Sequence, residues 1–272
     1  MAASDAFTAG VAFAASLLSI PILGVGVWLA TQPADSCAPL LQWPLVALGV
    51  SLLLSSAAAA AAALRRATSL LLCCLVATLA LLLALAGLAA FVFAVTADGA
   101  PARPAPGRAF AEYRVEDSSG WLRRRVEGRR RWGRIKECLS GSTSTCADMN
   151  RTYNSAQEFF DSRITPLQSG CCKPPTQCGY TFVSPTVWIN PTSASSHIDC
   201  FLWSNDQAVL CYSCAACKAG LIATLRKEWR RADVVLVVSL LALLVAYAMT
   251  CCAFRRAKTQ ELLQRYKQGY YT

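Results

Sequence analysis

Four long stretches of the 272-residue chain contain no Asp, Glu, Lys or Arg. A helix that crosses the roughly 30 Å hydrocarbon core of a bilayer needs about 20 apolar residues, and each stretch reaches that length. Four buried helices without an ionisable group would be unusual in a water-soluble fold. The sequence therefore predicts four membrane-spanning helices. The stretches lie between Asp5 and Asp35, Asp35 and Arg65, Arg66 and Asp98, and Asp233 and Arg255.

The first of these stretches has an alternative reading as a signal peptide cleaved near Ala30 or Ala34. Two features oppose that reading. No Lys or Arg precedes the apolar residues, and the stretch runs well beyond the 7–15 residues of a signal-peptide core. We therefore interpret it as a membrane-spanning helix.

Positive charge in the short connections predicts the orientation. The turn with Arg65 and Arg66 and the basic start of the C-terminal tail are expected in the cytosol. Four basic residues within 226–231 oppose this rule, but loops longer than about 60 residues translocate largely regardless of charge. The predicted order is a cytosolic N-terminus at 1–7, spans at 8–30, 41–63, 70–97 and 233–254, exterior loops at 31–40 and 98–232, a cytosolic turn at 64–69 and a cytosolic tail at 255–272.

Cysteine usage agrees with this orientation. Ten of the 14 cysteines fall in the two exterior loops, a density that an oxidising compartment permits and a reducing cytosol discourages. The even count predicts that all ten form disulfides. They are Cys37, Cys138, Cys146, Cys171, Cys172, Cys178, Cys200, Cys211, Cys214 and Cys217.

The motif GCCKPP contains two adjacent cysteines. A bond between Cys171 and Cys172 would require a strained turn. Side chains of neighbouring residues in an extended chain point in different directions, and the following prolines favour extended geometry. We expect the two thiols to bond to two different segments. The spacing of Cys211, Cys214 and Cys217 could indicate a metal or redox site in a cytosolic protein, but an oxidising compartment favours disulfides.

Two modifications are predicted from local sequence. Asn150 begins an Asn-Arg-Thr glycosylation motif in the long loop. Four further cysteines lie beside cytosolic arginines at the ends of the third and fourth spans, where S-palmitoylation occurs. The alternative is that these cysteines are small apolar residues of the helices. The palmitoylation candidates are Cys73, Cys74, Cys251 and Cys252.

The long loop is expected to be mostly helical. An apolar pattern from Glu112 to Leu139, broken at Gly128, and a stripe from Leu221 to Trp229 predict two amphipathic helices that continue the third and fourth spans as a stalk. The basic run at 123–131 could bind acidic polysaccharide or anionic lipid headgroups, or could be a solvated helix face.

The long loop is also the only exterior region large enough for a specific interface, which needs about 800 Å² per partner. Aromatic residues on a pre-ordered surface are favoured at binding hot spots. The alternative is that the aromatic residues fill the small core of the loop. The candidate partner-binding residues are Phe182, Trp188, Phe201 and Trp203.

Several function classes fit the sequence poorly. The single histidine, His197, and the absence of nucleophile or phosphate-loop motifs argue against an enzyme, a cofactor and a small-molecule substrate. A channel or transporter is also disfavoured, because the spans contain no charged residue that could line an ion path. Glycines such as Gly24, Gly26, Gly49 and Gly87 instead suit close helix packing. The net charge of +10 is shared between the two membrane faces, which argues against nucleic-acid binding.

Several segments together resemble the tetraspanin family, in its plant form. They are LSIPILGVGVWLA, LQWPLVALGVS, EDSSGWL, WGRIKEC, ITPLQSGCCKPPTQCGYTFVSPTVW and CFLWSNDQAVLCYSCAACKAG. The alanine run at 57–63 departs from the family pattern. The resemblance implies an all-α integral membrane protein with four transmembrane helices and a disulfide-stapled, mostly helical large extracellular loop.

The resemblance also implies a function. Tetraspanins are non-enzymatic scaffolds that associate with other membrane proteins, including other tetraspanins, in microdomains of the lipid bilayer. Plant members are associated with cell differentiation and developmental signalling. We therefore expect a multi-pass plasma-membrane protein with both termini in the cytosol. A four-span adhesion or receptor-like protein is the alternative.

Overall fold

The computed structural model of the chain describes residues 2–31, 37–38, 40–65, 68–97, 103–141, 145–189, 191 and 197–270. Most of the short loop 31–40 and part of the turn 64–69 lie outside the described residues. The contacts divide the chain into two compact units. The helical unit is Met1–Ala30, Leu40–Val92 and Arg231–Thr272, and the loop unit is Thr31–Pro39 and Phe93–Arg230.

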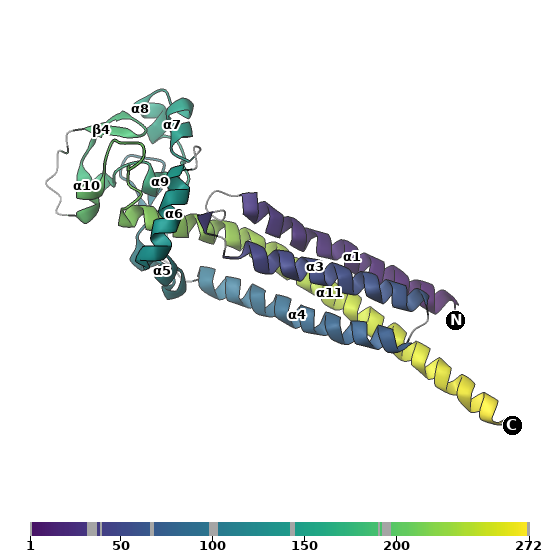
Figure 1. Cartoon of the computed structure of the whole chain (residues 1–272). Coiled ribbons are helices and arrows are strands. Elements are labelled where there is room, and N and C mark those ends of the chain that lie inside the picture. The colour runs from purple at the N-terminus through teal and green to yellow at the C-terminus, as the bar shows by residue number, and fades with distance from the viewer. Residues whose placement is uncertain are drawn as a thin grey trace. The chain divides into compact units, whose positions relative to one another are not determined.

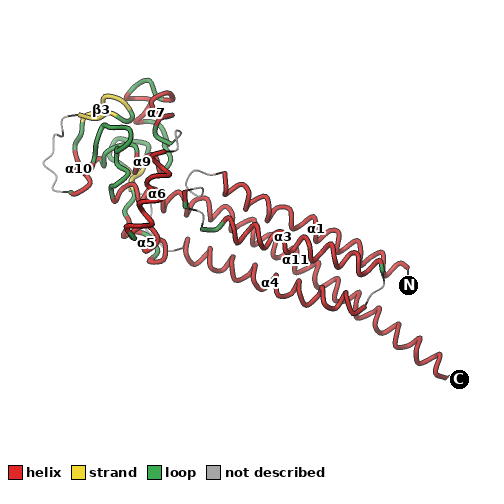
Figure 2. Tube along the Cα trace, viewed as in Figure 1, coloured by secondary structure: helices red, strands yellow, loops and turns green. Residues whose placement is uncertain are grey.

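The helical unit consists of long apolar helices (Figures 1 and 2). They are α1 (Ala2–Thr31), α3 (Gln42–Leu64), α4 (Thr68–Ala97) and the C-terminal part of α11 (Ala215–Tyr270). Each has a stretch that is long and apolar enough to cross a membrane, at Phe13–Thr31, Gln42–Ala62, Leu72–Ala97 and within Ala215–Cys252. Large apolar side chains are exposed along all four helices, as expected where the surrounding medium is lipid.

Two glycines allow α1 and α3 to approach closely. A Cβ atom on Gly26 would lie 2.8 Å from Val46 Cγ2, and one on Gly49 would lie 2.7 Å from Leu23 Cγ. The small-residue prediction is therefore right for these two positions. It is wrong for Gly24 and Gly87, where an added Cβ meets nothing within 4 Å.

Polar and small residues also join the helices of this unit. The hydroxyl oxygens of Ser16 on α1 and Ser56 on α3 are 2.8 Å apart. The alanine run of α3 forms a buried cluster in which Ala59 and Ala62 pack with Cys74 of α4. Ala60 and Phe254 cover that cluster. Alanine side chains thus let three helices meet at short distance.

The loop unit is built from short helices and two two-stranded hairpins. In chain order they are β1 (Arg103–Pro104), β2 (Ala111–Glu112), the 3-10 helix η1 (Val115–Asp117), α5 (Gly120–Glu127), α6 (Arg129–Gly141), α7 (Ala147–Thr152), α8 (Ala156–Phe160), α9 (Pro166–Cys171), the 3-10 helix η2 (Thr176–Cys178), β3 (Thr181–Ser184), β4 (Val187–Ile189), α10 (Ile198–Leu202) and the first turns of α11.

The predicted stalk is right for one helix and wrong for the other. α11 runs without a break from Ala215 through the fourth apolar stretch. On the other side α4 ends at Ala97, and α5 begins only at Gly120. The expected helix from Glu112 is therefore wrong in its first turns, because Glu112 belongs to a hairpin in which it pairs with Arg103. The break at Gly128 separates α5 from α6 as predicted.

An aromatic cluster fills the core of the loop unit beside the second hairpin. Phe159 is fully buried, and its ring centre lies 5.4 Å from that of Phe182, 5.6 Å from that of Phe110 and 6.3 Å from that of Trp188. Phe182 on β3 is paired with Trp188 on β4. One face of the hairpin therefore belongs to the core, and the opposite face points outward.

Candidate partner-binding surface and the cysteine framework that holds it

Five disulfides pair the ten cysteines of the loop unit. Their sequence separations range from 101 residues to 3, so the longest links the short loop after α1 to α6 and the shortest closes a single turn. The bonds are Cys37–Cys138, Cys146–Cys172, Cys171–Cys217, Cys178–Cys200 and Cys211–Cys214. Within the C-x2-C-x2-C run, Cys211 and Cys214 bond to each other, and Cys217 bonds to Cys171 of another segment.

The adjacent cysteines bond to opposite sides. Cys171 is joined to Cys217 in the first turn of α11, and Cys172 is joined to Cys146 just before α7. The expected extended backbone is wrong, however. Cys171 is the last residue of α9, and Cys172 caps the helix with φ −102° and ψ −5°. Successive helical residues are about 100° apart around the axis, which separates the two thiols equally well.

Gly170 allows the same helix to touch the backbone of α11. A Cβ atom on Gly170 would lie 2.2 Å from the carbonyl oxygen of Ala216. Gly220 on α11 approaches α9 in the same way, since its Cβ would lie 2.4 Å from the carbonyl oxygen of Pro166. The Cα atoms of Cys171 and Cys217 are accordingly only 4.3 Å apart.

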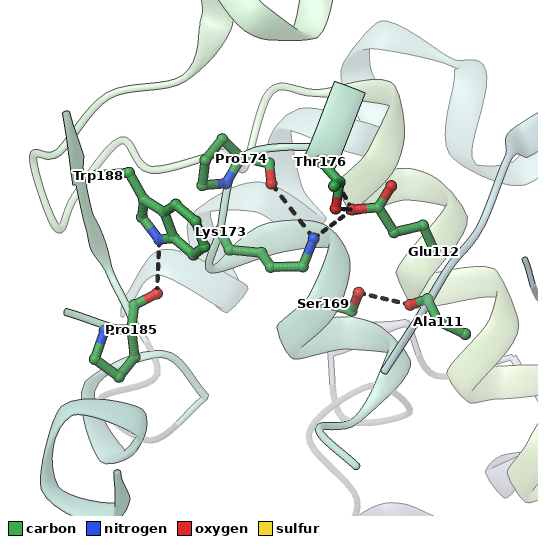
Figure 3. Close-up of polar contacts among 8 residues, drawn as sticks. All are labelled: Ala111, Glu112, Ser169, Lys173, Pro174, Thr176, Pro185 and Trp188. Atoms are coloured by element: carbon green, nitrogen blue, oxygen red, sulfur yellow. Dashed lines mark hydrogen bonds and ion pairs between the residues drawn. The ribbon is translucent and has the colours of Figure 1, made fainter. Parts of the chain in front are cut away.

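Lys173, which follows Cys172 in the chain, joins the cysteine motif to the first hairpin (Figure 3). Its side chain is 1% exposed, and its Nζ donates to Glu112 Oε1 at 2.5 Å and to the Pro174 carbonyl at 3.3 Å. Glu112 Oε1 also accepts from the backbone N–H and the hydroxyl of Thr176, at 2.9 and 2.7 Å. Residues 170–173, which we call the junction segment, therefore contact α11, the α7 region and the hairpin in turn.

The buried ion pair shifts the titration of its members. Burial alone would raise the pKa of Glu112, but the Lys173 ammonium and the hydrogen bonds from Lys173 and Thr176 outweigh burial and hold this pKa below its ordinary value. The carboxylate is therefore ionised at neutral pH. Sequence reasoning did not single out either residue, and only the position of Lys173 within the cysteine motif hinted at its role.

Another set of contacts fixes α10 beside the second hairpin. The Cys178–Cys200 disulfide joins α10 to η2, and the Tyr180 hydroxyl donates to the Cys200 carbonyl at 3.1 Å. The Asn205 side chain accepts from the Trp188 N–H and donates to the Trp188 carbonyl, both at 2.9 Å. α10 and β4 are thus held in one fixed arrangement.

This arrangement presents apolar side chains to the exterior. Ile198, Phe201 and Leu202 lie at i, i+3 and i+4 on α10 and are 62%, 74% and 38% exposed. Val183 and Ile189 of the hairpin are 53% and 43% exposed. We call the three exposed residues of α10 the apolar patch. It could have been recognised from their spacing, but a five-residue helix is too short for a reliable signal.

The predicted partner-binding residues divide between this patch and the core. Phe201 is the most exposed member of the patch. The prediction is wrong for Trp188 and Trp203, which are 4% and 8% exposed and cannot supply a contact surface. Phe182 is half-buried and stacks on Phe159. The alternative, that aromatic residues fill the small core, therefore holds for Trp188 and Phe182.

The candidate modification sites differ in accessibility. Asn150 is exposed on α7, and its Nδ2 donates to Thr186 Oγ1 at 2.7 Å, so glycosylation there remains a prediction. Among the palmitoylation candidates, Cys73 and Cys252 are exposed and Cys251 is half-buried, whereas Cys74 is buried against Ala59 and Ala62. Acylation of Cys74 would require the helices to repack.

Comparison with known proteins identifies a matching family and several similar proteins. The family model described as Tetraspanin family matches residues 5–256. Protein TORNADO 2 of Arabidopsis thaliana is 47% identical over 95% of this chain and 95% of its own length. Tetraspanin-2 of the same plant is 46% identical over 99% of this chain and 100% of its own length, and Tetraspanin-3 is 40% identical over 82% and 79%. No solved structure gives a significant match.

The family match, the four apolar helices and the disulfide-bonded loop agree with one another. They show a multi-pass membrane protein with a membrane-organising role. The chain belongs to the tetraspanin family.

Proposed function

We propose that this tetraspanin gathers partner proteins into membrane microdomains by binding them through the apolar patch of the loop unit. The single observation that carries the proposal is the exposure of Ile198, Phe201 and Leu202 on a helix that a disulfide holds in place. Apolar groups exposed on a rigid surface gain free energy on burial without a large ordering cost. The partners are other membrane proteins, including further tetraspanins.

The proposed arrangement in the cell follows from charge and cysteine chemistry. Both termini and the turn at 64–69 face the cytosol, and both cysteine-bearing loops face the exterior of the plasma membrane. The ten paired cysteines support an oxidising exterior compartment for the loop unit. Palmitoyl chains on Cys73, Cys251 or Cys252 would add membrane affinity on the cytosolic side.

The proposal includes a non-enzymatic mode of action. Binding at the patch changes which proteins are neighbours and transforms no substrate, so neither a cofactor nor a small-molecule substrate takes part. By analogy with the developmental role that the resemblance implies, the outcome in the plant would be regulation of cell differentiation. A four-span adhesion or receptor-like protein is the alternative, and it would use the same patch toward a neighbouring cell or a soluble ligand.

Proximity labelling tests this proposal in the native tissue. A labelling enzyme fused to the C-terminal tail is compared between the natural chain and the variant Ile198→Ser/Phe201→Ser. We expect the variant to reach the same membrane and to lose a defined set of labelled membrane proteins. Gln157→Ser, an exposed substitution on α8, is the matched control and should retain them.

One outcome would overturn the proposal. If the labelled set is unchanged in the patch variant while both proteins are present in equal amounts, the patch does not select partners. Exchange of residues 138–217 for those of a relative with different partners then shows whether the helices of the membrane make the choice instead.

A further inference from the structure

The level at which the chain leaves the membrane is marked by contacts within the loop unit. Arg226 and Arg230 of α11 both bind the Thr96 carbonyl, one residue before α4 ends at Ala97. The Arg226 Nε and Arg230 Nε lie 3.2 Å from that oxygen, and an Arg230 Nη lies 2.8 Å from it. Because α4 is one of the helices able to cross the bilayer, these guanidinium groups lie at its exterior boundary in the proposed topology.

Helix α5 is fixed at the same level. The Trp121 ring centre is 6.3 Å from that of Trp229, the residue before Arg230. The Arg125 guanidinium lies 4.7 Å from the centre of the Trp121 ring, and Leu122 of the same helix is buried. Trp229 is fully buried, so α5 packs closely against α11 at this position.

A covalent bond holds α6 within the loop unit. Cys138 near its C-terminal end is joined to Cys37 of the short loop that follows α1.

The α5–α6 pair carries a large excess of positive charge. Within 123–131, six arginines stand against Glu127 alone, a net charge of +5. Arg123 pairs with Glu127 at 3.5 Å. Within the described part of the chain, no carboxylate lies at ion-pair distance from the exposed Arg124, Arg129, Arg130 or Arg131. Like charges this close repel one another, so a bound polyanion would stabilise the cluster.

We propose that α5 and the first turn of α6 bind phosphate groups of lipid headgroups in the exterior leaflet. Guanidinium groups bind phosphate through paired hydrogen bonds, and phosphates are the anions present at the level that Thr96 and Trp229 mark. An acidic polysaccharide also carries negative charge, but it lies outside the headgroup layer. This proposal rests on the proposed membrane topology and not on partner binding by the apolar patch.

Hydrogen–deuterium exchange of the full chain tests the proposal locally. The detergent-solubilised protein is titrated with short-chain phosphatidic acid, and protection of peptides covering 120–141 gives a dissociation constant for this site apart from the basic tail. For Arg124→Gln/Arg130→Gln we expect that constant to rise about 25-fold, since each arginine near an anionic surface contributes about fivefold. Arg151→Gln/Arg163→Gln removes the same charge from α7 and the loop before α9 and should change it less than about twofold.

Two further titrations distinguish the ligands. Short-chain phosphatidylcholine should protect the same peptides more weakly, and oligogalacturonate should protect them only at much higher concentration. The proposal is overturned if phosphatidic acid leaves 120–141 unprotected, if the two double variants respond alike, or if oligogalacturonate binds there more tightly than the lipid. Protease accessibility of 120–141 in sealed vesicles tests the topology separately, and partner labelling through the patch is unaffected by any of these results.

Discussion

Different kinds of contact stabilise the interior of each of the two units of this tetraspanin. In the helical unit, glycine and alanine let helices approach, and a pair of serine hydroxyls at 2.8 Å joins α1 to α3. In the loop unit, five disulfides and a buried ion pair join short elements. The four cysteines of the helical unit are free thiols.

The difference follows from the surroundings of each unit. Lipid tails are as apolar as leucine, so helices in a bilayer gain little from hiding leucine and depend on close van der Waals contact. The loop unit is surrounded by water but consists of short elements with a small core, which seldom suffices without covalent links. Substitutions that remove links should therefore affect the loop unit much more than the helical unit.

Removal of a disulfide that closes a long stretch of chain should give the largest effect, and the effect should fall with the length of chain that each bond closes. Cys171→Ala/Cys217→Ala opens a separation of 46 residues and should lower the free energy of unfolding by about 4 kcal/mol. Cys211→Ala/Cys214→Ala opens a separation of 3 and should cost about 2 kcal/mol. Denaturant unfolding of the full chain in detergent, followed by near-ultraviolet circular dichroism, measures both. Equal losses would contradict the grading.

The buried ion pair should come next. Glu112→Gln leaves the Lys173 ammonium without its partner and should cost about 3 kcal/mol. The double variant Glu112→Leu/Lys173→Met removes both charges and should recover much of that loss. The same unfolding measurement applies. If the double variant is less stable than Glu112→Gln alone, the penalty of an unpaired charge is not the cause.

The same pair predicts a dependence on pH. Because the Glu112 pKa is lower in the folded chain, the carboxylate stabilises the fold above its unfolded pKa of about 4.3, and this contribution is lost as pH falls through the folded pKa. Unfolding free energies measured from neutral pH to below pH 4 should therefore decline more steeply for the natural chain than for Glu112→Gln. If the free energies of unfolding of the two proteins fall in parallel with pH, other carboxylates control the loss of stability at low pH.

Glycine substitutions compare the two units directly and should give effects equal to or smaller than that of Glu112→Gln. Gly170→Ala forces a Cβ against the backbone carbonyl of Ala216, which cannot move alone, and should cost about 3 kcal/mol. Gly26→Ala meets the Val46 side chain at 2.8 Å, which can shift, and should cost about 1 kcal/mol. Thermal unfolding of the two variants ranks them, and a larger loss for Gly26→Ala would reverse the comparison.

Acylation should have the smallest effect on stability, because a lipid chain on an exposed cysteine replaces one apolar contact by another. Cys73→Ser/Cys252→Ser should lower the signal in acyl-exchange labelling with the unfolding midpoint almost unchanged. Cys74→Ser should leave the labelling unchanged, since that thiol is buried against alanines. Labelling that depends on Cys74 would mean that the helices open during modification.

Much of this fold could be predicted because long-range chemistry leaves a signal in the sequence. Charge-free stretches indicate the four apolar helices, and the density of cysteines indicates a loop that folds in an oxidising compartment. The two hairpins were missed, although TFVS and VWI around Pro185 and Thr186 alternate in the manner of paired strands. The first hairpin was missed because a helix was expected from Glu112 onward and because each of its strands has only two residues.

The candidate surface could be predicted less well. Whether an aromatic residue is buried depends on tertiary contacts, so Trp188 and Phe201 look alike in sequence but are 4% and 74% exposed. Disulfide pairing is likewise undetermined by spacing, since ten cysteines allow many connectivities. The Lys173–Glu112 pair joins residues 61 positions apart, and no local pattern reports such a contact.

The junction segment, in which adjacent cysteines bond to two different segments, is central to the fold of the loop unit. Thiol mapping of single variants tests it directly. In Cys172→Ser, a denatured and alkylated sample should carry one new label, on Cys146, and in Cys171→Ser the new label should be on Cys217. The natural chain should show none at these four positions. A label on Cys171 in the Cys172→Ser variant would reveal a bond between the adjacent cysteines and would contradict the account.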